Sequence, residues 1–188
     1  DEAIIREEAP DALILALGAK PLILPVPGIH NSNVLIGADL TEDSVLGNQV
    51  VVIGGGLVGC EQALHIARDG HQVVILEMQD DLATDCVVTH RENLMHQLQS
   101  CDRIQILTGA RCTEITDTGV KVDKGGKEET IAADTVVLAA GMKADSEQVN
   151  QLRTIVPQTY VIGDCNQAGK IMRAVRDAYD AVVDFGLF

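Results

Sequence analysis

The stretch Val50-Val51-Val52-Ile53-Gly54-Gly55-Gly56-Leu57-Val58-Gly59-Cys60-Glu61 decides the fold of this 188-residue chain. The apolar, β-branched run predicts a strand, the glycines predict a tight turn, and the residues up to Gly70 follow a helical pattern. A second apolar run ends at Glu77 and predicts the next strand. This order and spacing predict the first βαβ unit of a dinucleotide-binding fold. The alternative is a glycine-rich turn that only packs a helix on a sheet.

Three glycines have separate expected roles in this unit. Gly54 allows the tight turn out of the strand, Gly56 lets the backbone approach a pyrophosphate, and Gly59 lets the helix pack closely on the strand. The free N–H groups and the positive end of the helix are expected to hold the phosphates.

Glu77 indicates which dinucleotide is bound. A carboxylate at the end of the second strand accepts hydrogen bonds from an adenosine ribose diol, whereas it would repel a 2′-phosphate by about 4 kcal/mol per charge pair in a semi-exposed site. Residues 78–85 contain three Asp and no Lys or Arg. The sequence therefore favours NAD(H) over NADP(H).

Composition excludes several classes of partner. The net charge is -14 and the hydrophobic fraction is 46%, so nucleic acid and anionic membranes, both polyanions, are not expected partners. No apolar run reaches a membrane span, and the acidic N-terminus does not resemble a targeting peptide, so we expect a cytoplasmic protein. The five cysteines have no C-x-x-C spacing and are expected to be reduced structural thiols.

The pattern continues after the fingerprint. A helix is expected over residues 87–99 and a third parallel strand over residues 104–107. Short strands at residues 112–116, 120–122 and 128–132, joined by glycine turns, predict an antiparallel meander. The fold class is α/β: a Rossmann-like domain with a parallel sheet plus this meander.

An internal repeat indicates a second domain. Residues 134–143, Asp-Thr-Val-Val-Leu-Ala-Ala-Gly-Met-Lys, repeat residues 11–20, Asp-Ala-Leu-Ile-Leu-Ala-Leu-Gly-Ala-Lys. Two copies of one strand-to-glycine ending imply two homologous dinucleotide folds, of which the first is represented only by its tail. A strand at residues 159–162 and a helix at residues 170–185, with an apolar stripe, are expected to return to that first fold.

The remaining segments give weaker patterns. Residues 2–8 predict a short helix, residues 11–18 a buried strand, and the prolines at positions 21, 25 and 27 an irregular linker. Residues 34–46 are ambiguous and are interpreted as a loop with one helical turn, and residues 144–157 read as polar and irregular.

Five elements in order resemble the two-dinucleotide flavoproteins related to pyridine nucleotide-disulfide oxidoreductases, in which an NAD domain is inserted into an FAD domain. They are Leu15-Ala16-Leu17-Gly18-Ala19, Pro25-Val26-Pro27-Gly28, the fingerprint from Gly54 to Glu61, Ala139-Ala140-Gly141 and Val161-Ile162-Gly163-Asp164. The sequences of these motifs look closest to the C-terminal region of NADH:flavin oxidoreductases of the enoate reductase and 2,4-dienoyl-CoA reductase group. The resemblance implies an FAD-domain tail at residues 1–22, an NAD domain at 23–145 and further FAD domain at 146–188.

Cofactor contacts follow from the resemblance residue by residue. It implies that Glu77 holds the adenosine ribose, that Glu61 faces the nicotinamide carboxamide, that Gly141 lines the nicotinamide side, and that the pyrophosphate is held by Gly54, Gly55, Gly56, Leu57 and Val58. Glu61 has an alternative reading as an exposed carboxylate favoured by the helix dipole.

The FAD contacts are implied in the same way. They are Gly18, Gly163, Asp164, whose carboxylate would bond the ribitol, and Ile171 at a helix start. Asp164 is alternatively a turn or N-cap residue. The family's FAD fingerprint would lie before Asp1, so this chain alone is not expected to bind FAD tightly.

The implied activity is hydride transfer from NADH to flavin, feeding reduction of an enoate or enoyl-CoA substrate in an upstream barrel domain that carries FMN and an iron–sulfur cluster. The alternative function is a non-catalytic module that binds an adenine nucleotide or is purely structural. No catalytic side chain is expected, because the cofactors carry the chemistry. No metal site is expected either, since Cys86 and His90 lack a third ligand at a suitable spacing.

Overall fold

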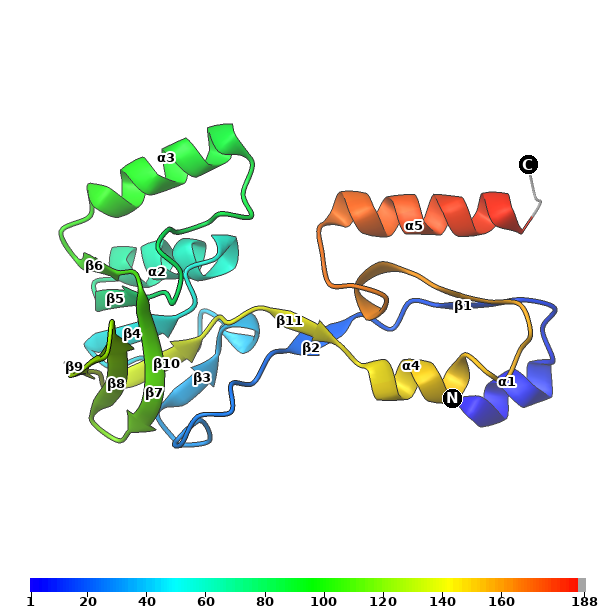
Figure 1. Ribbon diagram of the computed structural model, residues 1–188, viewed down its shortest axis with the longest axis horizontal. Helices are drawn as coiled ribbons and strands as arrows, with labels where there is room; N and C mark the ends of the chain where they lie inside the picture. Colours follow the sequence, from blue (N-terminus) through cyan, green and yellow to red (C-terminus); the bar gives the residue numbers. More distant parts are fainter. Residues whose placement is uncertain (186–188) are drawn as a thin grey trace. The chain divides into compact units, whose positions relative to one another are not determined.

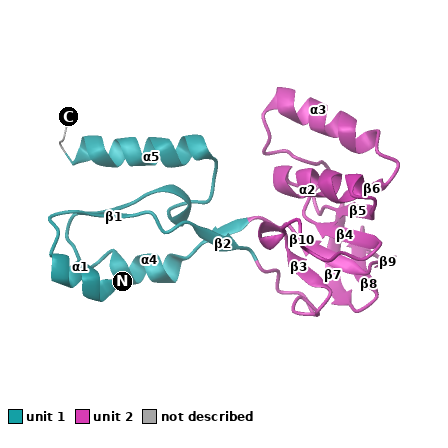
Figure 2. Cartoon of the chain, turned by 180° about the vertical axis from the view of Figure 1, so that it is seen from behind, with its two compact units in different colours: residues 1–22, 142–188 teal, residues 23–141 magenta. Residues whose placement is uncertain are grey.

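The computed structural model describes residues 1–185 and divides the chain into two compact units (Figure 2). Unit 1 comprises Asp1–Leu22 and Met142–Phe188, and unit 2 is the continuous segment Ile23–Gly141. Sequence placed the second boundary after residue 145, whereas the contacts assign residues 142–144 to unit 1. The reason is that these residues form a strand paired with a strand near the N-terminus.

Unit 2 is built on a five-stranded parallel sheet. The strands lie in the order β3 (Val34–Ile36), β10 (Thr135–Leu138), β4 (Gln49–Ile53), β5 (Gln72–Leu76) and β6 (Ile104–Leu107). Their Val, Ile and Leu side chains are buried on both faces in the central strands, which is why β4 and β10 read as continuous apolar runs. The three strands predicted around the fingerprint are confirmed.

Different elements pack on the two faces of this sheet (Figure 1). Helices α2 (Leu57–Arg68) and α3 (Val88–Gln99) pack on one face, and the predicted antiparallel meander of β7 (Ala110–Thr116), β8 (Gly119–Lys124) and β9 (Lys127–Ala132) packs on the other. Two cores therefore hold the unit, with the sheet between them.

Strand β3 corrects the reading of residues 34–46 as a loop and a helical turn. The segment begins with a strand that pairs with β10, a partner about a hundred residues away in sequence, and continues into the short 3₁₀ turn Gly37–Asp39. A strand of three residues is too short to show a period, so only its distant pairing defines it.

Unit 1 is formed from an N-terminal and a C-terminal segment of the chain. Helix α1 (Glu2–Glu8) is capped by Asp1, and β1 (Leu13–Leu15) pairs in parallel with β12 (Thr159–Val161). The predicted return of the C-terminal strand to the first fold is confirmed. The prediction of a buried strand over residues 11–18 was wrong in extent, because β1 has three residues and Ile14 is 49% exposed.

The two copies of the repeat leave their sheets in the same way. Gly18 and Gly141 both have positive φ, 74° and 102°, a conformation that glycine adopts without steric cost. The strands that follow them, β2 (Ala19–Pro21) and β11 (Met142–Ala144), pair antiparallel with each other. Strand β2 includes Pro21, which corrects the irregular reading at that residue, whereas residues 22–33 form no helix or strand, as predicted.

Two helices complete unit 1. Helix α4 (Ser146–Leu152), with Asp145 as its N-cap, corrects the irregular reading of residues 144–157. Helix α5 (Ile171–Asp184) has the predicted position, but its apolar stripe is not packed in this chain, because Ile171 is 85% and Val175 64% exposed. The core of unit 1 is correspondingly small and consists of Leu15, Val149 and Cys165 with their partly buried neighbours.

Candidate functional site

The glycine loop, residues 54–56, lies at the carboxyl edge of the parallel sheet. Strand β4 ends at Ile53, the Gly54 amide donates to the Leu76 carbonyl at 2.9 Å, and the Ala139 amide donates to the Ile53 carbonyl at 2.8 Å. The ends of β4, β5 and β10 therefore meet around the loop. This edge is where open α/β sheets bind their ligands.

Close packing explains two of the glycines. Gly54 has a φ of 115°, and a side chain there would overlap the Ala139 carbonyl. A methyl group on Gly59 would overlap the carbonyl oxygen of Gly54. Helix α2 therefore approaches the turn as closely as the fingerprint predicts.

The start of α2 faces open space. Gly56 is exposed, and the nearest atom to a side chain placed on it would be Asp85 Oδ1 at 3.9 Å. Gly56 is the N-cap and offers no side-chain bond to the first-turn amides. The Leu57 amide instead donates to Asp85 Oδ1 at 3.2 Å. A helix start of this kind presents N–H groups and a positive dipole end to an anion.

Glu77 directly follows β5, and its carboxylate accepts hydrogen bonds from the backbone around it. Oε2 accepts from the Gly55 amide at 2.6 Å and Oε1 from the Gln79 amide at 2.8 Å. The residue is only 9% exposed. The sequence predicted a ribose acceptor here, but it did not reveal that the same carboxylate fixes the glycine loop.

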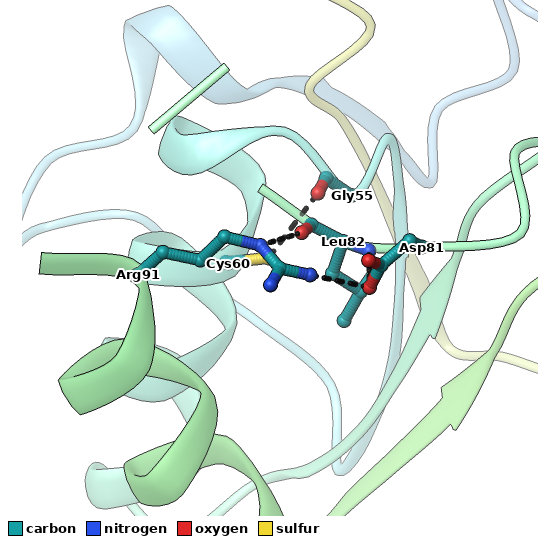
Figure 3. A network of polar contacts seen from close by, with 5 residues as sticks. All are labelled: Gly55, Cys60, Asp81, Leu82 and Arg91. Atoms are coloured by element: carbon teal, nitrogen blue, oxygen red, sulfur yellow. Dashed lines mark hydrogen bonds and ion pairs between the residues drawn. The ribbon is translucent and has the colours of Figure 1, made fainter. Parts of the chain in front are cut away.

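Arg91 of α3 was missed by the sequence reasoning (Figure 3). Its Nε donates to the Leu82 carbonyl at 2.9 Å, and its Nη2 pairs with Asp81. Leu82 in turn is buried against Gly55. The acidic loop, residues 78–85, thus contains no cation of its own but receives one from α3. No local sequence signal marks this contact, because Arg91 reaches the loop only after α3 has packed.

Cys60 of α2 contacts the glycine loop. Its Sγ donates to the Gly55 carbonyl at 3.4 Å (Figure 3). Burial, followed by the nearby charge of Glu77, raises the pKa of the thiol to about 12. The side chain is therefore a neutral packing group.

Glu61 and Gln62 point to different neighbours from the first half of α2. Glu61 Oε1 lies 3.7 Å from Nε2 of His90 in α3, and both side chains are about half exposed. Gln62 Nε2 donates to the Gly37 carbonyl at 2.6 Å, at the end of β3. Gly141 follows β10 and is exposed.

Two of the residues predicted for FAD, Gly18 and Gly163, lie at the same edge of the β1–β12 pair in unit 1. Strands β1 and β12 run parallel, so Gly18 and Gly163 both follow their carboxyl ends. The Gly163 amide donates to Asp177 of α5 at 3.0 Å. Asp164 accepts from the Gly169 amide at 3.0 Å and so has a turn-forming role. Ile171 is the first residue of α5 and is exposed.

The fold and the glycine loop define a Rossmann-like dinucleotide-binding domain, inserted as a continuous segment into a second α/β unit, which confirms the predicted fold class. The sequence matches the family "Pyridine nucleotide-disulphide oxidoreductase" over residues 6–181. The chain belongs to this family of flavin- and pyridine nucleotide-dependent oxidoreductases.

Individual relatives narrow the group. The chain is 33% identical to a cinnamate reductase from Clostridium sporogenes over 94% of its length, and 36% identical to an NADH oxidase from Thermoanaerobacter brockii over 95%. The structure of 2-naphthoyl-CoA reductase in complex with 2-naphthoyl-CoA matches 96% of the chain with a TM-score of 0.85 and 33% identity.

The chain spans only part of these proteins. It covers 27% of the cinnamate reductase, 28% of the NADH oxidase and 28% of the 2-naphthoyl-CoA reductase. The resemblance to the enoate reductase group is thereby confirmed for a region of these larger enzymes. Within residues 1–185, every helix is too short or too polar to cross a bilayer.

Proposed function

We propose that this chain is the NADH-binding portion of an FAD-dependent oxidoreductase that passes hydride from NADH to flavin. The observation that carries the proposal is the open start of α2 at the carboxyl edge of the sheet, with Glu77 at the neighbouring strand end. Relatives named NADH oxidase and cinnamate reductase support the same chemistry.

The residues around the glycine loop fit a dinucleotide. Gly56 leaves space for a pyrophosphate, whose charge the first-turn amides of α2 would bind. Glu77 would accept from the adenosine ribose with the lone pairs that its two backbone bonds leave available. Gly141, without a side chain beyond β10, would let the nicotinamide approach.

The proposed preference for NADH over NADPH rests on the negative charge near the ribose position. Glu77 and the acidic loop present carboxylates where a 2′-phosphate would lie. Arg91 contributes a cation to that loop, and its guanidinium is engaged by Asp81 and the Leu82 carbonyl. It therefore neutralises the loop only in part.

Unit 1 would supply part of the flavin site. In this proposal Gly18, Gly163, Asp164 and the start of α5 at Ile171 line the flavin, and the exposed face of α5 packs against further FAD-domain structure. When bound, the two cofactors supply hydride transfer between nicotinamide and flavin. The residues of each unit would bind and orient the cofactor of that unit for this transfer.

The final acceptor is proposed by analogy with the relatives. An enoate or enoyl-CoA substrate agrees with the names cinnamate reductase and 2-naphthoyl-CoA reductase. Its reduction in an upstream domain with FMN and an iron–sulfur cluster rests on the family resemblance alone. The partners proposed for the chain are accordingly NADH, FAD and that upstream domain.

Calorimetric titration with NADH, NADPH and FAD tests the proposal. We expect NADH to bind and NADPH to bind at least tenfold more weakly. The variant Gly56→Val fills the open space at the start of α2, where φ is -68° and a side chain meets no steric conflict, and should abolish NADH binding while unit 2 remains folded, at some cost in stability because Val is a poor N-cap residue. Val88→Ala, at the exposed start of α3 and outside the proposed nucleotide site, is the matched control. Unchanged NADH binding by Gly56→Val would refute the site, and no NADH binding by the wild type would favour a non-catalytic module.

A further inference from the structure

Asp85 contacts the start of α2. Its Oδ1 accepts from the Leu57 amide at 3.2 Å, and the same atom lies nearest to the open side of Gly56. Leu57 is the first residue of α2, so this amide belongs to the group that the helix itself leaves without a partner. A carboxylate of the chain thus lies where an external anion would bind.

The acidic loop is held in place by several bonds rather than by Asp85 alone. The Ala83 amide donates to the Gly55 carbonyl at 2.7 Å, and the Cys86 amide donates to the Ala83 carbonyl at 3.0 Å. Leu82 is 1% exposed, and Arg91 bonds its carbonyl. Asp85 is therefore presented to α2 by a loop that is anchored on both sides of it.

We infer that the Asp85 carboxylate is an internal anion that competes with the dinucleotide pyrophosphate for the N-terminus of α2. The inference rests on the proposed function. Both groups are negative, and both are stabilised by the same N–H groups and helix dipole. A pyrophosphate must therefore displace Asp85 from Leu57 or bind beside its charge, and either event weakens dinucleotide binding.

The variant Asp85→Asn separates charge from shape. The amide oxygen of Asn can still accept from the Leu57 N–H, but the negative charge is gone. Because Asp85 is exposed, solvent screens its repulsion, and we expect the dissociation constant for NADH to fall by about fivefold at low salt. The gain should shrink in high salt, which screens the wild-type repulsion.

Two comparisons make the test specific. Asp102→Asn removes the same charge from the exposed turn before β6, at the opposite edge of the sheet, and should leave NADH binding unchanged. ADP-ribose, which keeps the pyrophosphate, should gain as much as NADH from Asp85→Asn, whereas adenosine should gain nothing. Asp85→Ser offers a neutral acceptor of another shape and should show the same direction of change.

The outcomes are distinguishable. If the wild type binds NADH and both neutral variants bind it equally or more weakly, the competition is refuted while the proposed function stands. If the wild type binds no dinucleotide, the proposed function fails first. A gain for adenosine equal to that for ADP-ribose would also overturn the inference, because the effect would not then involve the pyrophosphate.

Discussion

Replacing Glu77 with Gln tests whether this carboxylate fixes the glycine loop before any ligand arrives. In the wild type it accepts backbone N–H bonds from Gly55 and Gln79 at 2.6 and 2.8 Å while only 9% exposed. Hydrogen bonds to a charged group contribute about 1.5–3 kcal/mol each. Gln keeps one oxygen acceptor but turns an NH₂ group toward the other amide, so one bond is lost and two donors face each other.

We expect unit 2 to lose about 2–4 kcal/mol of unfolding free energy, or roughly 10 °C in Tm. The assay uses the distribution of aromatic residues: both tyrosines, at positions 160 and 179, lie in unit 1, and unit 2 contains no Phe, Tyr or Trp. Urea unfolding followed by far-UV circular dichroism should show an earlier transition, while tyrosine fluorescence should keep its midpoint.

Glu61→Gln is the matched control, because Glu61 is exposed and pairs with the half-exposed His90 on the surface. Its stability should stay within about 0.5 kcal/mol of the wild type. If Glu77→Gln is equally neutral, the bonds to Gly55 and Gln79 do not hold the loop, and the reasoning about the buried carboxylate is refuted.

The structure also makes Glu77→Arg a poor test of nucleotide preference, since the guanidinium would replace a buried acceptor.

Three further perturbations test other parts of the structure. Gly59→Ala should destabilise unit 2 by about 1–3 kcal/mol in urea unfolding, despite the better helix propensity of Ala, because its methyl group overlaps Gly54; wild-type stability would refute the close packing. Burial raises the pKa of Cys60 to about 12, so this thiol should resist a thiol reagent at neutral pH in the folded chain and react once the chain unfolds. Thiol titration of the wild type and of Cys60→Ser, each folded and unfolded, measures this difference. Lys20 lowers the pKa of Asp145 below its usual 3.8 through a hydrogen bond, so the pair stabilises unit 1 above that pH and the stabilisation is lost as pH falls through the lowered pKa; tyrosine-detected unfolding of Asp145→Asn should depend less on acid pH than the wild type, and an identical pH dependence would contradict this.

The fingerprint region could be predicted because its physics is local. The run of β-branched residues, the glycine turn and the amphipathic helix are each defined within about twenty residues, and all three formed where expected. The repeat of residues 11–20 and 134–143 likewise predicted two equivalent crossings, which the structure shows as the glycines at 18 and 141 and the paired strands β2 and β11.

Features that depend on distant partners could not be predicted in this way. Strand β3 is three residues long and is defined by its pairing with β10. Arg91 and Asp85 gain their contacts only when α3 and the acidic loop have packed against the glycine loop. Helix α4 was hidden by its polar sequence, since only Val149 is buried. All the cofactor contacts assigned to individual residues, in both units, stay predictions.

The pairing of β2 with β11 has a consequence for how such a chain can be rearranged. Pro21 and Met142 are partners in one antiparallel ladder, so the chain leaves unit 1 and returns to it at adjacent positions. A segment whose two ends emerge side by side can be excised and replaced by a hairpin turn, or exchanged for another domain with adjacent termini, without stretching its host. Residues 23–141 therefore have the geometry of an exchangeable domain, and the β2–β11 ladder is the position at which another domain could be joined to unit 1.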